Sequence, residues 1–155
     1  MGMVYKSYKK GEIAARMLET ALDLYFDRGD GFAIIHVAAA AEEVLAGLFK
    51  NKGNEHISGL VCTAREKTIS ALKEIHAVHD SKRSKKEIGT YLNFVRNKTK
   101  HHDAESDSDE IATCLELEVE SVISRAIENY VLYFKVPTEK MLRYINRVSL
   151  HRNDR

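Results

Sequence analysis

The stretch FAIIHVAAAAEEVLAGLF, residues 32–49, decides the fold because it is apolar around nearly the whole circumference of a helix. A helix without a broad polar face has to be covered by other elements, so this stretch predicts a central buried helix. His36 lies inside it, and we interpret this residue as a core histidine with a satisfied ring rather than a catalytic group. Glu42 and Glu43 are expected to mark the exposed edge of the helix.

Apolar residues at helical spacing also flank this stretch on both sides. The helix before it should end at DRGDG, residues 27–31, where Gly29 and Gly31 break the pattern and Asp30 can cap the next helix. A third helix is expected over residues 60–78. The apolar stripe of the first helix consists of Ala14, Met17, Leu18, Ala21, Leu22 and Tyr25.

The second half of the chain predicts three more helices. Ser84 and Glu87 form a capping box, so a short helix should begin there. Residues 106–110 supply a cap and an acidic first turn for a long helix that Pro137 ends. TEKMLRYINRV, residues 138–148, predicts a short final helix. The buried face of the helix after Ser84 is expected to consist of Ile88, Tyr91, Leu92 and Val95.

Together these elements predict an all-α protein, an antiparallel up-and-down helical bundle of four main helices plus short extra helices. The chain has 155 residues, one proline and no tryptophan, which suits a single helical domain over residues 1–155. We expect residues 1–8 and 147–155 to be frayed ends. A second interpretation, in which Tyr5, Tyr8 and the last residues are contact segments, stays open.

Several classes of protein are excluded by the sequence. No apolar run reaches the roughly 20 residues of a membrane helix, and the N-terminal residues lack the apolar core of a signal peptide. Cys62 and Cys114 lie far apart within helical patterns, so we expect buried thiols in a reducing compartment. We therefore predict a cytoplasmic protein without a metal site and without a cofactor.

Charge is sorted along the chain although the net charge is only +1. Residues 82–100 contain seven Lys or Arg and one Glu, a net charge of +6, whereas residues 103–120 contain eight carboxylates and no Lys or Arg. Two solvated surfaces that attract each other would explain this pattern. A basic patch that attracts phosphate would explain it equally well.

The stretch FVRNKTKHH, residues 94–102, lies at the junction of a helix end and a polar loop, where bundle stability requires neither its arginine nor its histidines. Within it, RNKTKH resembles the R-N-x-x-x-H form of the Arg-x4–6-His signature of HEPN domains. These are small all-α bundles named for higher eukaryotes and prokaryotes nucleotide-binding. The resemblance covers the helix pattern of nearly the whole chain, and its specific part is Arg96, Asn97 and His101.

The resemblance implies a metal-independent endoribonuclease, a toxin or anti-phage effector that acts as a homodimer with the motif at or near the interface. His101 would exchange protons with the RNA 2′-hydroxyl or the leaving 5′-oxygen, Arg96 would stabilise phosphate charge, and Asn97 would position His101 or the phosphate. The products would be a 2′,3′-cyclic phosphate and a 5′-hydroxyl. The residues expected to hold the RNA backbone are Lys98, Lys100, His102, Lys82, Arg83, Lys85 and Lys86.

One position departs from the family pattern. Some toxin members carry a tyrosine two residues after the motif histidine, which a partner nucleotidyltransferase modifies, whereas this chain has Asp103 there. The departure weakens the expectation of an antitoxin or nucleotidyltransferase partner. Asp103 could instead raise the pKa of the His101 imidazole.

Other interpretations of the same residues stay open. Arg96 could be a helix C-terminal cation paired with Glu116 or Asp109, Asn97 a C-cap, and His101 a solvated loop residue. The whole domain could be a non-catalytic module that binds a nucleotide or a protein partner. A metal site is a weaker possibility, because adjacent histidines usually point apart. Its candidate ligands are His101, His102, Asp103 and Asp107, or alternatively His76 and His79.

Overall fold

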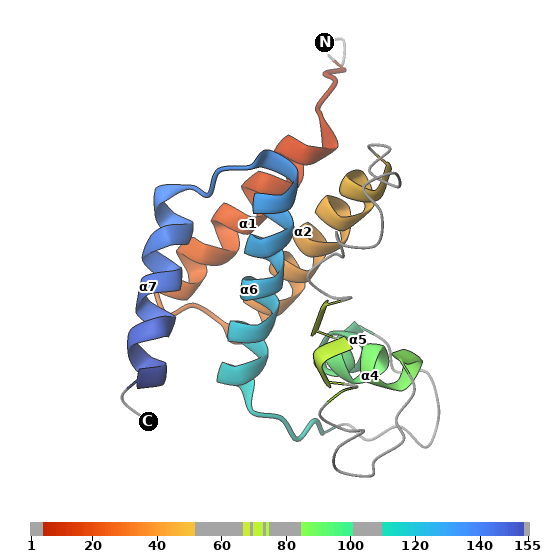
Figure 1. Cartoon of the computed structure of the whole chain (residues 1–155), viewed down its shortest axis with the longest axis vertical. Helices are drawn as coiled ribbons and strands as arrows, with labels where there is room; N and C mark the ends of the chain where they lie inside the picture. The colour runs from red at the N-terminus through yellow and green to blue at the C-terminus, as the bar shows by residue number, and fades with distance from the viewer. Residues whose placement is uncertain are drawn as a thin grey trace, which may run out of the picture.

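The computed structural model describes residues 5–51, 67–68, 70–72, 74, 85–100 and 110–153. These residues are predominantly helical and none of them lies in a strand, which confirms the all-α prediction (Figure 1). Residues 67–68, 70–72 and 74 are helical, and the rest of the predicted third helix lies outside the described residues. The helices with defined bounds are α1 (Lys10–Phe26), α2 (Gly31–Asn51), α4 (Lys85–Leu92), α5 (Phe94–Lys100), α6 (Leu115–Phe134) and α7 (Glu139–Asn153).

The connection between α1 and α2 is the short turn that the sequence predicts. Gly29 donates its N–H to the carbonyl of Leu24 at 2.7 Å, which closes the end of α1. Asp30 then accepts a hydrogen bond from the N–H of Ala33 at 2.8 Å. This side-chain contact satisfies a free N–H group of the first turn of α2 and confirms Asp30 as its cap.

Contacts along their lengths show how the longer helices run. A Cβ atom on Gly31 would lie 2.8 Å from the side chain of Leu115, so glycine permits the close approach of the starts of α2 and α6. Glu42 and Arg125, near the middles of the same helices, are also in contact, so α2 and α6 run in the same direction. α7 returns antiparallel to α6, and Tyr144 donates its hydroxyl to the carbonyl of Glu120 at 3.1 Å.

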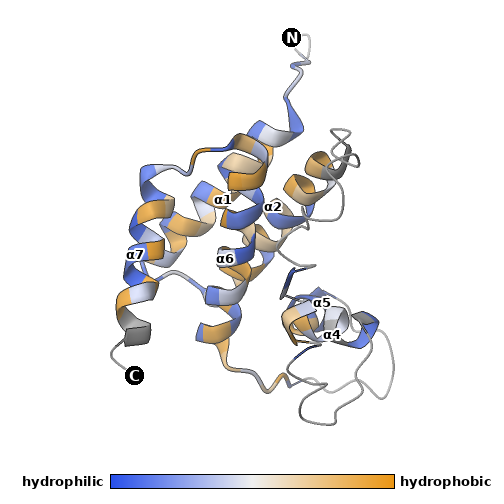
Figure 2. Cartoon of the chain, viewed as in Figure 1, coloured by the Kyte–Doolittle hydropathy of each residue, from blue (hydrophilic) through white to orange (hydrophobic). Residues whose placement is uncertain are grey.

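The hydrophobic core lies between α1, α2, α6 and α7, with α2 packed against both α1 and α6. Figure 2 shows hydrophobic stretches on these helices alternating with hydrophilic ones, as expected for helices with one buried side. Residues from α2 supply much of this core, which confirms the predicted central helix. The core residues of α2 are Ile34, Ile35, Ala38, Ala39, Ala41, Leu45 and Phe49.

Within α2, the segment Gly31–Phe49 is long and apolar enough to cross a membrane by length and composition alone. The core helix of a globular protein meets the same two criteria. The packing of α2 against α1 and α6 covers the core residues of this segment.

The short helix expected after Ser84 is present but is interrupted. α4 ends at Leu92, and the N–H of Asn93 bonds to the carbonyl of Thr90 at 3.2 Å in a tight turn before α5. Val95 is fully buried, as predicted, whereas Tyr91 is 58% exposed, so the prediction that it is buried is wrong.

The predicted start of the long helix before Pro137 is wrong, and so is the predicted burial of Cys114. Residues 110–114 are not helical, and α6 begins at Leu115 rather than within residues 106–110. Leu115 packs against the core whereas residues 112–114 are exposed, so an earlier turn would gain little from packing. Cys114, expected to be a buried thiol, is exposed at the N-cap of α6.

The final helix is more than the small extra element predicted from residues 138–148. α7 has 15 residues and continues to Asn153. It buries Met141, Tyr144 and Val148 against the rest of the core. The Tyr144 ring packs edge-to-face on Tyr25 of α1, with the ring centroids 5.0 Å apart, so α7 is an integral part of the core.

Candidate functional site

The basic motif residues lie on α5, which packs against α2 at the edge of the core. Val95 is 1% exposed and anchors the helix. Arg96 follows it and turns toward α2, whereas Asn97, Lys98 and Lys100 are exposed to solvent. Helix geometry separates consecutive side chains by roughly 100°, so Asn97 faces away from the direction of Arg96.

The guanidinium of Arg96 forms a two-pronged ion pair with the carboxylate of Glu43 on α2. Nη2 donates to Oε2 at 2.9 Å, and Nη1 donates to Oε1. The Arg96 side chain is only 13% exposed, whereas that of Glu43 is 51% exposed. The hydrogen bond to Glu43 raises the pKa of Arg96, so the guanidinium is fixed in its charged form and in one orientation.

A second contact joins the same two helices near the first. Nε2 of His36 on α2 lies 2.7 Å from Oγ1 of Thr99 on α5. His36 is partly buried, so it lies at the edge of the core rather than inside it. Burial lowers the pKa of His36, and the positive charges of Arg96 and Lys100 lower it further, so the ring is predominantly neutral at pH 7.

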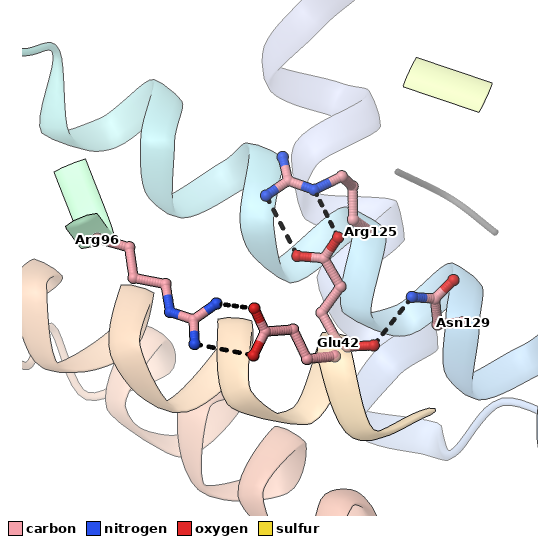
Figure 3. Close-up of polar contacts among 5 residues, drawn as sticks. Glu42, Arg96, Arg125 and Asn129 are labelled. Atoms are coloured by element: carbon pink, nitrogen blue, oxygen red, sulfur yellow. Dashed lines mark hydrogen bonds and ion pairs between the residues drawn. The ribbon is translucent and has the colours of Figure 1, made fainter. Parts of the chain in front are cut away.

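A buried ion pair lies on the other side of the same segment of α2. Arg125 on α6 donates from Nε and Nη2 to the carboxylate of Glu42, at 3.0 and 3.2 Å (Figure 3). Its Nη1 donates to Oγ of Ser121 at 2.7 Å. The side-chain amide of Asn129 donates to the backbone carbonyl of Glu42 at 3.1 Å (Figure 3). Glu42 therefore ties α2 to α6, while its neighbour Glu43 ties α2 to α5.

The structure brings only part of the predicted site together. Of the three motif residues, Arg96 and Asn97 are described, and both lie on α5. Lys98 and Lys100 share that helix, and Lys86 is exposed on α4, which begins at Lys85. The predicted site residues outside the described residues are His101, His102, Lys82 and Arg83. The possible metal ligands Asp103, Asp107, His76 and His79 also lie outside them, as does Asp109.

Several predictions about individual residues are wrong. Glu42 is 4% exposed and does not mark an exposed edge of α2, because its carboxylate is neutralised by Arg125. Arg96 is near the start of α5 and pairs with Glu43, so it is neither a helix C-terminal cation nor a partner of Glu116. Asn97 is not a C-cap, since it lies inside α5 and its N–H bonds to the carbonyl of Asn93 at 2.8 Å.

The sequence-based prediction missed the role of α2 in this site. His36 and Glu43 are seven residues apart, close to two full helical turns, so they lie on one side of α2. Polar residues at this spacing in an otherwise apolar helix were the available signal. Their partners could not be identified in the same way, because Thr99 and Arg96 are 63 and 53 residues away along the chain.

Other features of the described residues do not point to a second reactive centre. Within residues 5–51, 85–100, 110–153 and the short pieces between them, no group of three or more His, Cys, Asp or Glu could hold a metal ion. A groove of about 360 Å³ lies between α6 and α7, and one of about 470 Å³ lies beside α1. Neither groove is lined by a residue of α5.

Comparison with known protein families, characterised proteins and solved structures finds no match to this chain. The chemistry available to the molecule is that of the residues around α5. That chemistry is a fixed guanidinium, a neutral imidazole and several exposed cations.

Proposed function

We propose that the chain is a HEPN-like antiparallel helical bundle that acts as a metal-independent endoribonuclease. The observation that carries this proposal is the orientation of Arg96 by Glu43 on a helix that also exposes Asn97, Lys98 and Lys100. A structural salt bridge alone would not require a run of exposed cations on the same short helix. A phosphate-handling site uses both features, because one cation has to be positioned and the others attract the RNA backbone.

The fixed guanidinium suits the stabilisation of a phosphorane-like transition state. Glu43 takes one N–H group from Nη1 and one from Nη2, and the other N–H groups of Arg96 remain for a phosphate oxygen. A donor that is already oriented needs no reorganisation when charge develops on the phosphate. The low exposure of Arg96 reduces the competing effect of water on such a contact.

His101 is the proposed proton-transfer group, since it follows α5 directly and has the residue type that works near neutral pH. It would take the proton of the 2′-hydroxyl as that oxygen attacks the adjacent phosphorus, or donate a proton to the 5′-oxygen as the P–O bond breaks. The products would be a 2′,3′-cyclic phosphate and a 5′-hydroxyl. Neither step requires a metal ion or another cofactor.

The proposal includes a cytoplasmic homodimer that brings two copies of the motif together, in a toxin–antitoxin or anti-phage setting. Tyr91 is 58% exposed and Phe94 is 36% exposed on either side of the turn between α4 and α5. Exposed aromatic side chains beside the motif are the kind of surface that a second copy could cover. An antitoxin or nucleotidyltransferase partner would have to act on the dimer without modifying the family's tyrosine, because this chain has Asp103 at that position.

A second candidate function is a non-catalytic module that binds a nucleotide or a protein partner. The observation that favours it is the engagement of Arg96 with Glu43, since a purely structural arginine would have the same partner and the same low exposure. In that case the exposed residues Lys98 and Lys100 would provide the binding surface.

The decisive experiment is the cleavage of a labelled RNA mixture in EDTA by the wild type and by Arg96→Ala and His101→Ala. We expect cyclic-phosphate products from the wild type and a loss of about 100-fold or more in each variant. Arg143→Ala is the matched control, because Arg143 stacks on Phe26 of α1 with its guanidinium carbon 4.3 Å from the ring centroid, and it belongs to α7. RNA binding without any cleavage by the folded wild type would favour the binding module.

A further inference from the structure

His36 has a setting that differs from that of an ordinary core histidine. It is partly buried on α2, and its ring reaches across to α5 rather than into the core. Thr99, which it contacts, is three residues after Arg96 and one before Lys100. Residues three and four apart lie on one side of a helix, so His36 faces the side of α5 that carries both cations.

The hydrogen bonds of Thr99 indicate how the imidazole is oriented. The Thr99 hydroxyl has one hydrogen, and it lies 2.9 Å from the carbonyl oxygen of Val95, which is a suitable acceptor. With that hydrogen on the carbonyl, Oγ1 accepts the Nε2–H of His36 at 2.7 Å. Nδ1 of the neutral ring then keeps its lone pair, and among the described residues none forms a hydrogen bond with it.

The charges around His36 favour an anion. Arg96 and Lys100 approach from α5 and disfavour the imidazolium, while Glu43 on α2 neutralises part of the charge of Arg96. A phosphodiester between these groups would add one negative charge, which together with that of Glu43 would balance Arg96 and Lys100 and would allow the ring to take up a proton. The protonated ring would then donate a charge-assisted hydrogen bond to the phosphate.

We propose that His36 is a further phosphate-binding residue of the α5 site, which contacts the same RNA phosphodiester as Arg96 and Lys100 while Thr99 fixes its ring. This inference rests on the proposed function, since it takes RNA as the ligand. It extends the site from one short helix to the crossing of α2 and α5. It also gives Thr99 the role of a positioning residue, which orients the imidazole without touching RNA.

The test is the binding of a short 2′-O-methyl RNA oligonucleotide, which lacks the attacking hydroxyl and therefore stays intact. We expect His36→Gln to raise the Kd about tenfold, as for a lost hydrogen bond to a charged group. Thr99→Val should raise it about threefold, because the ring loses only its orientation. Thr90→Val is the matched control, since Thr90 makes the same bond to a helix carbonyl, that of Lys86 at 3.0 Å, but lies on α4. It should bind RNA as the wild type does.

NMR of the imidazole gives a readout that a purely structural role would not move. The NMR signals of His36 are assigned by comparison with His36→Gln. The pKa of His36 should rise when the oligonucleotide is bound, and it should be the same in Thr90→Val as in the wild type. An unchanged Kd in a folded His36→Gln variant, an unchanged His36 pKa at saturation, or no oligonucleotide binding at all would overturn the proposed role.

Cleavage of unmodified RNA separates this inference from the proposed function. If cleavage requires Arg96, and the His36→Gln variant binds and cuts RNA as well as the wild type does, the ribonuclease activity stands and His36 is not part of its site. Oligonucleotide binding that shifts the His36 pKa, without any cleavage of unmodified RNA by the wild type, would leave the phosphate contact in place and remove the enzymatic activity.

Discussion

Two neighbouring glutamates on α2 hold two arginines in different environments. Glu42 and Arg125 are almost completely buried, with side chains 6% and 7% exposed. Glu43 and Arg96 lie at the surface of the helix crossing, where the glutamate is half exposed. Both pairs are two-pronged, but Arg96 donates from Nη1 and Nη2 whereas Arg125 donates from Nε and Nη2. The two pairs also differ in the access of their carboxylates to water.

This difference separates a structural role from a functional one. A buried pair has lost the hydration of both ions, so either partner is strongly unfavourable without the other. In the Glu43–Arg96 pair the arginine is mostly buried, but the carboxylate keeps about half of its exposure to water, so we expect this pair to contribute less to stability than the Glu42–Arg125 pair. The Glu42–Arg125 pair is therefore expected to fix the packing of α2 on α6. The Glu43–Arg96 pair can serve to orient Arg96 without being essential for folding.

The largest effect is expected from Glu42→Ala. The variant leaves the Arg125 guanidinium buried without its carboxylate, and it should reduce the free energy of unfolding by about 3–5 kcal/mol. Equilibrium urea denaturation followed by circular dichroism measures this change. Glu43→Ala, the same substitution one residue later, should reduce the free energy of unfolding by less than about 1 kcal/mol.

A double variant checks the physical reason for the first prediction. Glu42→Leu combined with Arg125→Met removes both charges and keeps apolar volume, so its stability should lie near that of the wild type. A double variant as unstable as Glu42→Ala would show that packing, rather than an unpaired charge, is responsible.

A smaller effect is expected from Ser121→Ala. The Ser121 hydroxyl accepts a hydrogen bond from Nη1 of Arg125 at 2.7 Å, and its loss should reduce the free energy of unfolding by about 1.5 kcal/mol. Ser124→Ala is the matched control on the same helix, because Ser124 is exposed. Equal urea midpoints for the two variants would contradict the view that Arg125 needs its third partner.

Much of the fold could be predicted because it depends on local sequence. The apolar pattern of residues 32–49 predicts a central helix, and Asp30 predicts where that helix begins. The start of α6 could not be predicted in this way. The acidic residues before it have the composition of a helix N-terminus, but α6 begins only at Leu115, where packing on the core becomes available.

The candidate site could be predicted only in part. The motif on α5 was visible in the sequence, since Arg96, Asn97 and Lys98 are consecutive. The contributions of His36 and Glu43 depend on tertiary packing. Helical spacing predicts which residues share a face, but it does not predict which distant helix covers that face. Glu42 shows the same limit, because burial of a glutamate is expected only when its partner is known.

The third prediction concerns salt. A double-mutant cycle for Glu43 and Arg96 should give a coupling of about 0.5–1 kcal/mol at low ionic strength, and 1 M NaCl should reduce it toward zero. The cycle for Glu42 and Arg125 should keep most of its coupling in 1 M NaCl, because ions do not reach a buried pair. Equal salt sensitivity of the two couplings would contradict the contrast between the pairs.

The smallest effect is expected from the titration of His36, which lies beside the exposed pair. Burial and the charges of Arg96 and Lys100 on α5 lower its pKa below the ordinary 6.5. The nearby carboxylate of Glu43 on α2 is paired with Arg96. A lowered pKa means that the unfolded chain binds the proton more readily, so this contribution to stability is present above about pH 6.5 and is lost as the pH falls through that value. Urea denaturation from pH 8 to pH 5 should therefore show a larger loss of stability for the wild type than for His36→Gln. Carboxylates common to both chains cancel in this difference. A difference that does not change over this range would show that the crossing of α2 and α5 leaves His36 as free to titrate as it is in the unfolded chain.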